Sequence, residues 1–255
     1  MIVTSLRPAF VSELTKIRTV RSTAWTLLLT LLVCAGLAYL VGASFRGATR
    51  RENFDPLFAT FYSLTLGQLP LVVFGVLVVG AEYSSGTIRA SLTAVPRRGL
   101  YFAGKVLACA LPAFCVSLLT VPATFFSAQA GLGPYGTSLD SDVAAAAVGA
   151  CLNLTLICVF AMGVAAMLRN TTLTLAILLP VFFLGSQGLG NIPGLRTVTQ
   201  YLPDQVGMVV MHLAGPQGDP RWARDYGPWT GLGLLALWAS IALVGGFLVL
   251  RRRDA

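Results

Sequence analysis

Six long apolar runs constrain this chain more than any other feature of its sequence. Each is close to the ~20 residues that a helix needs to cross ~30 Å of hydrocarbon. Backbone polar groups in lipid must be paired within their own segment, so we expect helices rather than barrel strands. The six runs are Ala24–Phe45, Phe58–Ala81, Tyr101–Ala128, Val143–Leu168, Thr172–Leu189 and Trp229–Leu250.

The composition excludes an ordinary water-soluble domain. Of 255 residues, 56% are hydrophobic and 11% are charged, whereas roughly a quarter of the residues in soluble domains are charged. A cleavable signal peptide is the competing interpretation of the first run, because Arg18 and Arg21 precede it. That run exceeds the 7–15 residues typical of such a peptide, and a leader of mixed polarity comes before it. We therefore predict an all-α membrane protein with one domain over 1–255 and a six-helix bundle over 24–250.

The charges predict an orientation. The termini and alternate loops on one side hold 12 of the 18 basic residues against 3 acidic ones, and the other side holds 6 against 7. By the positive-inside rule, both termini are cytoplasmic. The charges lie within a few residues of the membrane ends, so anionic lipid explains them better than nucleic acid does. We expect a multi-pass protein of the cell (plasma) membrane.

The sequence offers no convincing catalytic or metal site. It has one histidine, His212, in a loop expected outside the cytoplasm, and it has neither an HExxH motif nor a GxxxxGK[ST] phosphate cradle. We therefore expect no enzyme activity and no cofactor in this chain. A titratable group near the middle of a span, as ion-driven carriers need, is also missing. Five cysteines fall inside the apolar runs and are expected to be buried thiols: Cys34, Cys109, Cys115, Cys151 and Cys158.

The loop between the second and third runs has a specific order. Glu82 stands at the membrane exit, Gly86 permits a turn, and Thr87 can cap the helix that follows. Ile88 and Leu92 then share one helix face, and a proline ends the helix. The pattern predicts a short amphipathic helix beneath the membrane. Three basic residues would then return the chain to the headgroups: Arg97, Arg98 and Lys105.

The first 22 residues predict a helix that lies along the membrane surface. Its apolar stripe consists of Leu6, Phe10, Leu14, Ile17 and Val20, and basic residues including Arg7, Lys16 and Arg18 lie around it. Glu13 interrupts the stripe. It is either a contact for a partner or a salt bridge, or an interfacial carboxylate that reaches toward water.

These two segments resemble the permease subunits of type-2 ATP-binding-cassette (ABC) exporters. Residues 82–98 match the order Glu-Tyr-x-x-Gly-Thr-Ile-Arg-x-x-Leu-x-x-x-Pro-Arg-Arg of actinobacterial members, and residues 12–22 resemble the Ser-Glu-x-x-Lys-hydrophobic-Arg segment that opens such permeases. The resemblance implies a separate ATPase partner that carries ATP and Mg, and a second permease in a homodimer or related heterodimer. It also implies that the 82–98 loop contacts the ATPase, through Glu82, Tyr83, Gly86, Thr87, Ile88, Arg89, Leu92, Arg97 and Arg98. The interfacial helix contributes Glu13, Lys16 and Arg18.

Other functions stay open at this point. A non-transporting membrane scaffold or assembly factor would need no ATPase, and an intramembrane enzyme would need a convergent polar site that the sequence does not suggest. The long loop over 190–228 is expected outside the cytoplasm, with a short, partly buried helix over Tyr201–Met211.

Overall fold

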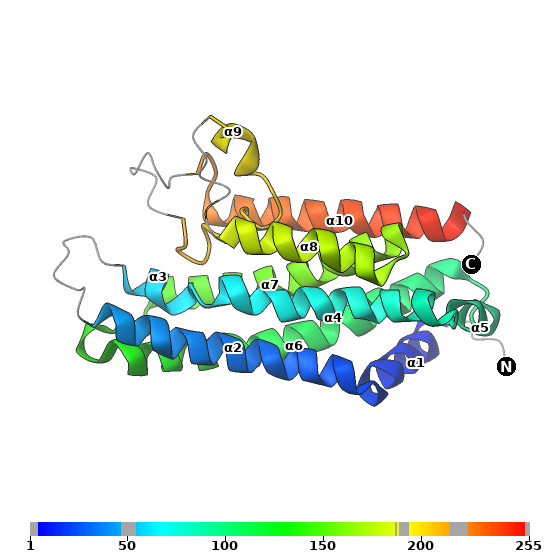
Figure 1. The fold of residues 1–255 in the computed structure, drawn as a ribbon, viewed down its shortest axis with the longest axis horizontal. Helices are drawn as coiled ribbons and strands as arrows, with labels where there is room; N and C mark the ends of the chain where they lie inside the picture. The colour runs from blue at the N-terminus through cyan, green and yellow to red at the C-terminus, as the bar shows by residue number, and fades with distance from the viewer. Residues whose placement is uncertain (1–4, 47–54, 187, 189–193, 215–223, 253–255) are drawn as a thin grey trace.

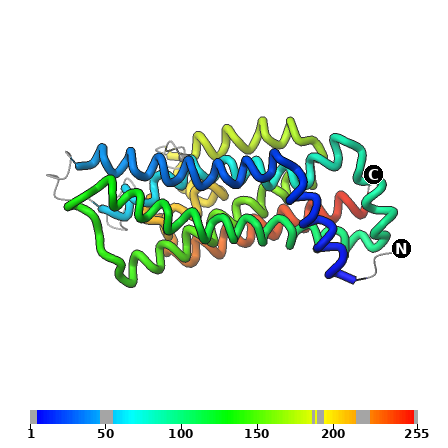
Figure 2. Tube along the Cα trace, turned by 90° about the horizontal axis from the view of Figure 1, so that it is seen from below, coloured from blue at the N-terminus to red at the C-terminus, as the bar shows by residue number. Residues whose placement is uncertain are grey.

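The chain is described by a computed structural model that covers residues 5–46, 55–186, 188, 194–214 and 224–252. Within these ranges the structure is helical and contains no strand. The long helices lie side by side along one axis, which gives an elongated bundle (Figures 1 and 2). The predicted all-α class is confirmed.

Among the described residues, five helical segments are long and apolar enough to cross a membrane. They are Arg21–Phe45 (α2), Pro56–Ser85, Arg98–Tyr135, Ser141–Leu168 (α7) and Pro228–Arg252 (α10). The second comprises α3 (Pro56–Phe61) and α4 (Leu64–Ser85), and the third comprises α6 (Arg98–Leu132) and a 3-10 turn, η1 (Gly133–Tyr135). Each contains or closely matches one of the predicted runs. The chain is thus built as a multi-pass membrane protein.

The remaining run, Thr172–Leu189, corresponds to a shorter helix. α8 spans Thr171–Ser186 and has 16 residues, which corresponds to about 24 Å of helix. That is less than the ~30 Å of a typical hydrocarbon core. Residues 187 and 189 of the predicted run lie outside the described residues, so a sixth span stays a prediction.

Local sequence signals account for several helix ends. Asp55 caps α3 by accepting a hydrogen bond from the Leu57 amide at 2.8 Å, and a proline follows it at the first helical position. Asp140 caps α7 in the same way, through the amide of Val143 at 2.9 Å. α7 ends where Arg169 takes a left-handed conformation with φ of 56°. Short polar side chains thus start helices here, as the physical chemistry of helix termini requires.

The bundle packs around α7. This helix contacts α4, α6 and α10, while α2 packs against α6 and α4, and α8 packs against α4. Small residues let α2 and α6 approach closely: a Cβ on Gly42 would lie 2.7 Å from the carbonyl oxygen of Ala128, and one on Gly131 would lie 2.5 Å from that of Tyr39. Such close contacts are typical of helix packing in membranes.

The two ends of the bundle differ. α1 (Leu6–Thr19), α5 (Ile88–Ala94) and the C-terminal end of α10 lie together at one end, which we call the α5 end (Figure 1). α3 and α9 (Arg196–Thr199) lie toward the other, which we call the α3 end. Arg98 ties α6 to α10 at the α5 end, because its Nη1 donates to the carbonyl oxygens of Leu250 at 2.6 Å and Arg251 at 3.0 Å.

The predicted helix over Tyr201–Met211 is wrong. The segment consists of successive turns, and the only helix between α8 and α10 within the described residues is the four-residue α9. Pro203 and Gly207 both disfavour a regular helix here. The predicted burial is correct, because most of these residues are buried.

This segment is packed into the bundle rather than lying outside it. A Cβ on Gly149 of α7 would lie 2.1 Å from the side chain of Val210, and one on Gly231 of α10 would lie 2.2 Å from the carbonyl oxygen of Val206. The Trp238 indole of α10 also donates to the carbonyl oxygen of Tyr201 at 2.8 Å. The stretch over 203–211 of the loop predicted over 190–228 therefore forms part of the core, whereas Leu195 and Val198 of the same loop are exposed.

The cysteines are all free thiols, and four of the five are buried as expected. Cys115 is the exception, and its predicted burial is wrong. It lies on the face of α6 that points away from the bundle, together with the exposed side chains of Leu111, Leu118 and Leu119. A thiol in an apolar run is thus not necessarily buried against protein, because the outer face of a membrane helix is apolar as well.

Candidate functional site

A tight turn joins α4 to the short helix α5. Gly86 ends α4 in a left-handed conformation with φ of 71°, which favours glycine at this position. Thr87 occupies the N-cap position of α5, but its side chain makes no capping hydrogen bond. Its hydroxyl instead lies 2.9 Å from that of Ser85. The predicted turn and short helix are confirmed, and the predicted capping bond of Thr87 is wrong.

α5 has a buried side and an exposed side. Ile88 is buried in the core, Val95 is buried just after the helix, and Leu92 is partly buried. Ile88 and Leu92 share the inner face, as their spacing predicts. Arg89 and Thr93 are exposed on the other side, and Ala90 and Ala94, which are also exposed, line a pocket toward α1.

Beneath α5 lies a charge cluster that we define as Glu13, Lys16, Glu82 and Lys105, in which Lys16 is half-buried and the other three residues are buried. Lys16 Nζ lies 2.6 Å from Glu13 Oε1 and 2.7 Å from Glu82 Oε1. Lys105 Nζ lies 2.5 Å from Glu13 Oε2 and 3.1 Å from Glu82 Oε1. Two carboxylates and two ammonium groups thus alternate, and they come from α1, α4 and α6.

Neighbouring groups complete the hydrogen bonds of the charge cluster. The Tyr101 hydroxyl of α6 donates to Glu82 Oε2. Lys16 donates to the Ser91 hydroxyl of α5 at 3.1 Å, and Lys105 donates to the carbonyl oxygen of Val78 at 3.3 Å. Through Ser91 the charge cluster therefore also contacts α5.

The balance of charge explains how such a group is tolerated in the interior. Lys105 is 1% exposed and Glu13 is 5% exposed, and an isolated buried charge would be strongly unfavourable. Burial acts to lower the pKa of Lys16, but its hydrogen bonds with Glu13 and Glu82 outweigh this and raise the pKa above the ordinary value. Removing any one member would leave a buried charge without compensation, so the cluster is expected to hold its helices together.

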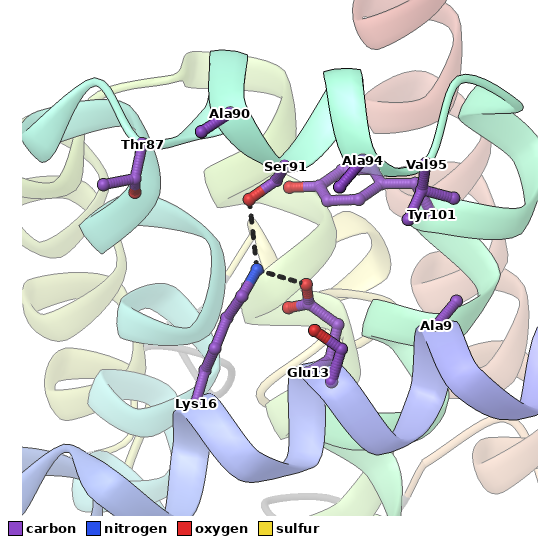
Figure 3. Close-up of a pocket in the computed structure, with 10 residues that line it drawn as sticks. Ala9, Glu13, Lys16, Thr87, Ala90, Ser91, Ala94, Val95 and Tyr101 are labelled. Atoms are coloured by element: carbon purple, nitrogen blue, oxygen red, sulfur yellow. Dashed lines mark hydrogen bonds and ion pairs between the residues drawn. The ribbon is translucent and has the colours of Figure 1, made fainter. Parts of the chain in front are cut away.

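A pocket of about 330 Å³ opens between α1 and α5, above the charge cluster. Figure 3 shows Glu13 and Lys16 pointing from α1 toward α5, with Lys16 reaching Ser91. The rest of the lining consists of small side chains, Ala9, Ala90 and Ala94 among them, together with Val95 and Tyr101. All the charged groups that line it are already paired with one another. The pocket therefore separates α1 from α5 without presenting a net charge.

The other predicted site residues lie around the charge cluster. The Arg169 guanidinium stacks over the ring of Tyr83 at 4.7 Å, which links the end of α7 to the end of α4. Arg98 binds the end of α10, and Arg97 is exposed at the start of α6. Arg18 is exposed on α1. The predicted residues thus gather at one end of the bundle, but only some of them touch one another.

The face of α1 that packs on the bundle differs from the predicted apolar stripe. Its buried residues are Ala9, Glu13 and Ile17, whereas Leu6 and Val20 are exposed. A close approach decides the orientation, because a Cβ on Gly104 of α6 would lie 3.2 Å from Ala9. Of the two roles considered for Glu13, the structure shows the salt bridge.

Sequence reasoning missed Lys105, Tyr101 and Ser91. Lys105 was expected at the headgroups, and that prediction is wrong, because the side chain is buried in the charge cluster. A signal for it exists, since a lone charge inside an apolar helix requires a buried partner. Its partners could not be named from spacing, because Glu13 is 92 residues away in the chain.

Comparison with protein-family models and with curated proteins finds no match for this sequence. The functional assignment therefore rests on the residues and their arrangement. Within the part of the chain that the structure describes, no group of three or more His, Cys, Asp or Glu side chains is placed to hold a metal ion.

Proposed function

We propose that this chain is the membrane-spanning permease subunit of an ATP-driven ABC exporter, and that it works with a separate ATPase. The observation that carries the proposal is α5. This short helix joins two long apolar helices at one end of the bundle, with its inner side buried and its outer side exposed. A helix so placed is suited to receive a motor protein.

The charge cluster supports a mechanical role for α5. It binds α1, α4 and α6 together directly beneath that helix, and Ser91 adds a contact to α5 itself. A displacement of α5 would therefore move the ends of α4 and α6 with it, instead of only bending a loop. The tight turn at Gly86 adds to this stiffness. In this proposal, closure of two ATPases on ATP transmits motion through α5 to these two spans.

The exposed side of α5 is the proposed contact for the ATPase. Arg89 lies on that side, and Arg97 is exposed just beyond the helix. Basic side chains there would meet acidic residues on a partner, and complementary charge steers and orients such encounters. ATP and Mg would bind to the ATPase and not to this chain.

The topology completes the proposal. We place the α5 end in the cytoplasm, with both termini there, and count α8 as a sixth span of the plasma membrane. The basic residues Arg7, Arg18, Arg89 and Arg251 belong to elements of the α5 end, which agrees with the positive-inside rule. Contact between this end and anionic lipid follows from the same charges.

A second permease would complete the pathway. An open apolar groove of about 660 Å³ lies on the surface where α2, α4 and α8 meet, and Pro70 and Pro180 are among its lining residues. A second permease, identical or related, placed against this face would enclose the groove. We therefore propose a complex of two permeases with two ATPases.

Reconstitution with the ATPase tests the proposal. We expect Glu82→Ala and Gly86→Pro to abolish transport-coupled ATP hydrolysis while the protein still inserts into membranes. Arg89→Glu reverses the charge of an exposed side chain, and we expect it to weaken stimulation of the ATPase while the protein still inserts into membranes. Arg18→Glu, an exposed basic residue on α1, is the matched control.

Undiminished coupling in all three α5-region variants would contradict the role of α5. Purification from native membranes provides a second test, since an exporter subunit should be recovered with an ABC ATPase. Recovery with other membrane proteins and without any ATPase would favour a scaffold or assembly factor instead.

A further inference from the structure

The single histidine of the chain lies at the α3 end, far from the charge cluster. His212 ends the buried turn segment over 201–212, and its Nδ1 lies 3.7 Å from Asp55 Oδ2. Both side chains are about half exposed, at 40% and 48%. Water therefore reaches the imidazole, which can exchange its proton with the solvent.

Of the carboxylates in the described ranges, three act on His212, and they come from two helices. Asp55 caps α3, Asp140 caps α7, and Asp142 lies in the first turn of α7. All three favour the protonated imidazole electrostatically. A proton on His212 would thus create an attraction between the turn segment and the N-terminal ends of α3 and α7.

The backbone fixes this histidine at the end of the segment. His212 takes a left-handed conformation with φ of 55°, which is unfavourable for a residue with a Cβ. Directly after it, the amides of Leu213 and Ala214 both donate to the carbonyl oxygen of Met208, at 2.9 and 3.3 Å. The strained turn therefore presents the imidazole to Asp55 and connects it to the buried part of the segment.

We propose that His212 is a proton-operated clamp, which fastens the end of the turn segment to α3 when protonated and releases it when neutral. The proton comes from water, and no other reactant is needed. Since the segment packs among α7, α8 and α10, its release would loosen the contacts at this end of the bundle.

The direction of the pH dependence follows from the two partners. The nearby Asp55 carboxylate raises the pKa of His212 above its ordinary value, against the opposing effect of burial. Burial acts to raise the pKa of Asp55, but the nearby imidazole of His212 and the hydrogen bond from the Leu57 amide lower the pKa overall. The clamp is therefore fully formed below the ordinary pKa of histidine, about 6.5, and is lost as the pH rises through the raised value. It is also lost in acid, as the pH falls through the lowered pKa of Asp55.

A single histidine allows a direct test by NMR. The full-length protein, labelled at histidine and purified with a tag that contains none, gives one imidazole titration curve. We expect a pKa above that of free histidine, and a shift to lower values in Asp55→Asn. Asp225→Asn removes a carboxylate that pairs with Gln200 instead, so it is the matched control and should leave the curve unchanged.

Hydrogen exchange gives a second readout. The protonation of a surface histidine that holds no segment in place would leave the exchange rates unchanged. After correction for the intrinsic rate, exchange in the peptide over 208–214 should speed up between pH 6 and pH 8, and His212→Gln should abolish this dependence. The proposal would be overturned if the pKa of His212 lies at or below that of free histidine and does not change in Asp55→Asn. A pH dependence that persists in His212→Gln would do the same.

The clamp rests on the proposed function in one respect only. If the α5 end is cytoplasmic, His212 faces the exterior and the clamp responds to external pH. Both measurements use the purified chain without an ATPase, so failure of the exporter proposal would leave their outcome unaffected.

Discussion

At the residue scale, Lys105 is the side chain on which the charge cluster most depends. It is buried, and it contacts both carboxylates of the cluster. We predict that Lys105→Met destabilises the protein by about 3 kcal/mol, because Glu13 and Glu82 would keep a buried negative charge with one cation fewer. Thermal unfolding in detergent measures this change.

Arg18→Ala provides the comparison for Lys105→Met. This side chain is also basic, but it is exposed, so its removal should change the stability by about 0.5 kcal/mol or less. Equal effects of the two substitutions would contradict the view that the charge cluster holds the helices together.

A second prediction at this scale concerns Gly86. An added Cβ would meet nothing within 4 Å, so the constraint there is the positive φ alone. Gly86→Ala should therefore cost about 1 kcal/mol. Gly99 near the start of α6 also has open space but no positive φ, and Gly99→Ala should stabilise the helix by roughly 0.5 kcal/mol. Unfolding curves that shift in the same direction for both variants would refute this account of the turn.

Residues of the site differ in how far the sequence predicts them. Gly86 and the shared face of Ile88 and Leu92 follow from local patterns, because turn and helix signals act over a few residues. The pairing of Glu13 with Lys105 depends on the packing of α1 against α6, which no local pattern records. The burial of Lys105 was therefore missed, although its partner Glu13 stood out as an irregularity.

At the element scale, the close packing of α2 against α6 leads to another prediction. Gly42→Ala would place a methyl group 2.7 Å from the carbonyl oxygen of Ala128, so the two helices must separate, at a cost of about 1–3 kcal/mol. Gly36 on the same helix meets nothing within 4 Å, and Gly36→Ala should be neutral or slightly stabilising. Thermal unfolding of the two variants compares them directly, and a neutral Gly42→Ala would contradict the tight contact.

The elements themselves were largely predictable. Five long apolar runs reappear as long apolar helices, because the thickness of a bilayer fixes the length of a span. The turn segment before α10 was predicted incorrectly as a helix. Its apolar residues reflect burial among α7, α8 and α10, and Pro203 and Gly207 break the helical pattern that burial alone suggested.

At the scale of the whole molecule, the proposed export requires the α5 end to be a docking surface for an ATPase. Thr93 is exposed on α5 and lies outside the charge cluster, so a photo-reactive amino acid placed there should leave the fold intact. Leu119, on the outer face of α6 and 64% exposed, is the matched position expected to face lipid.

Photo-crosslinking from Thr93 in native membranes is the most direct test. We predict a crosslink from position 93 to an ABC ATPase, with a yield that changes when ATP is added, and none from position 119. A crosslink from position 93 to a protein without a nucleotide-binding site, or no crosslink from this position in any nucleotide state, would contradict the account.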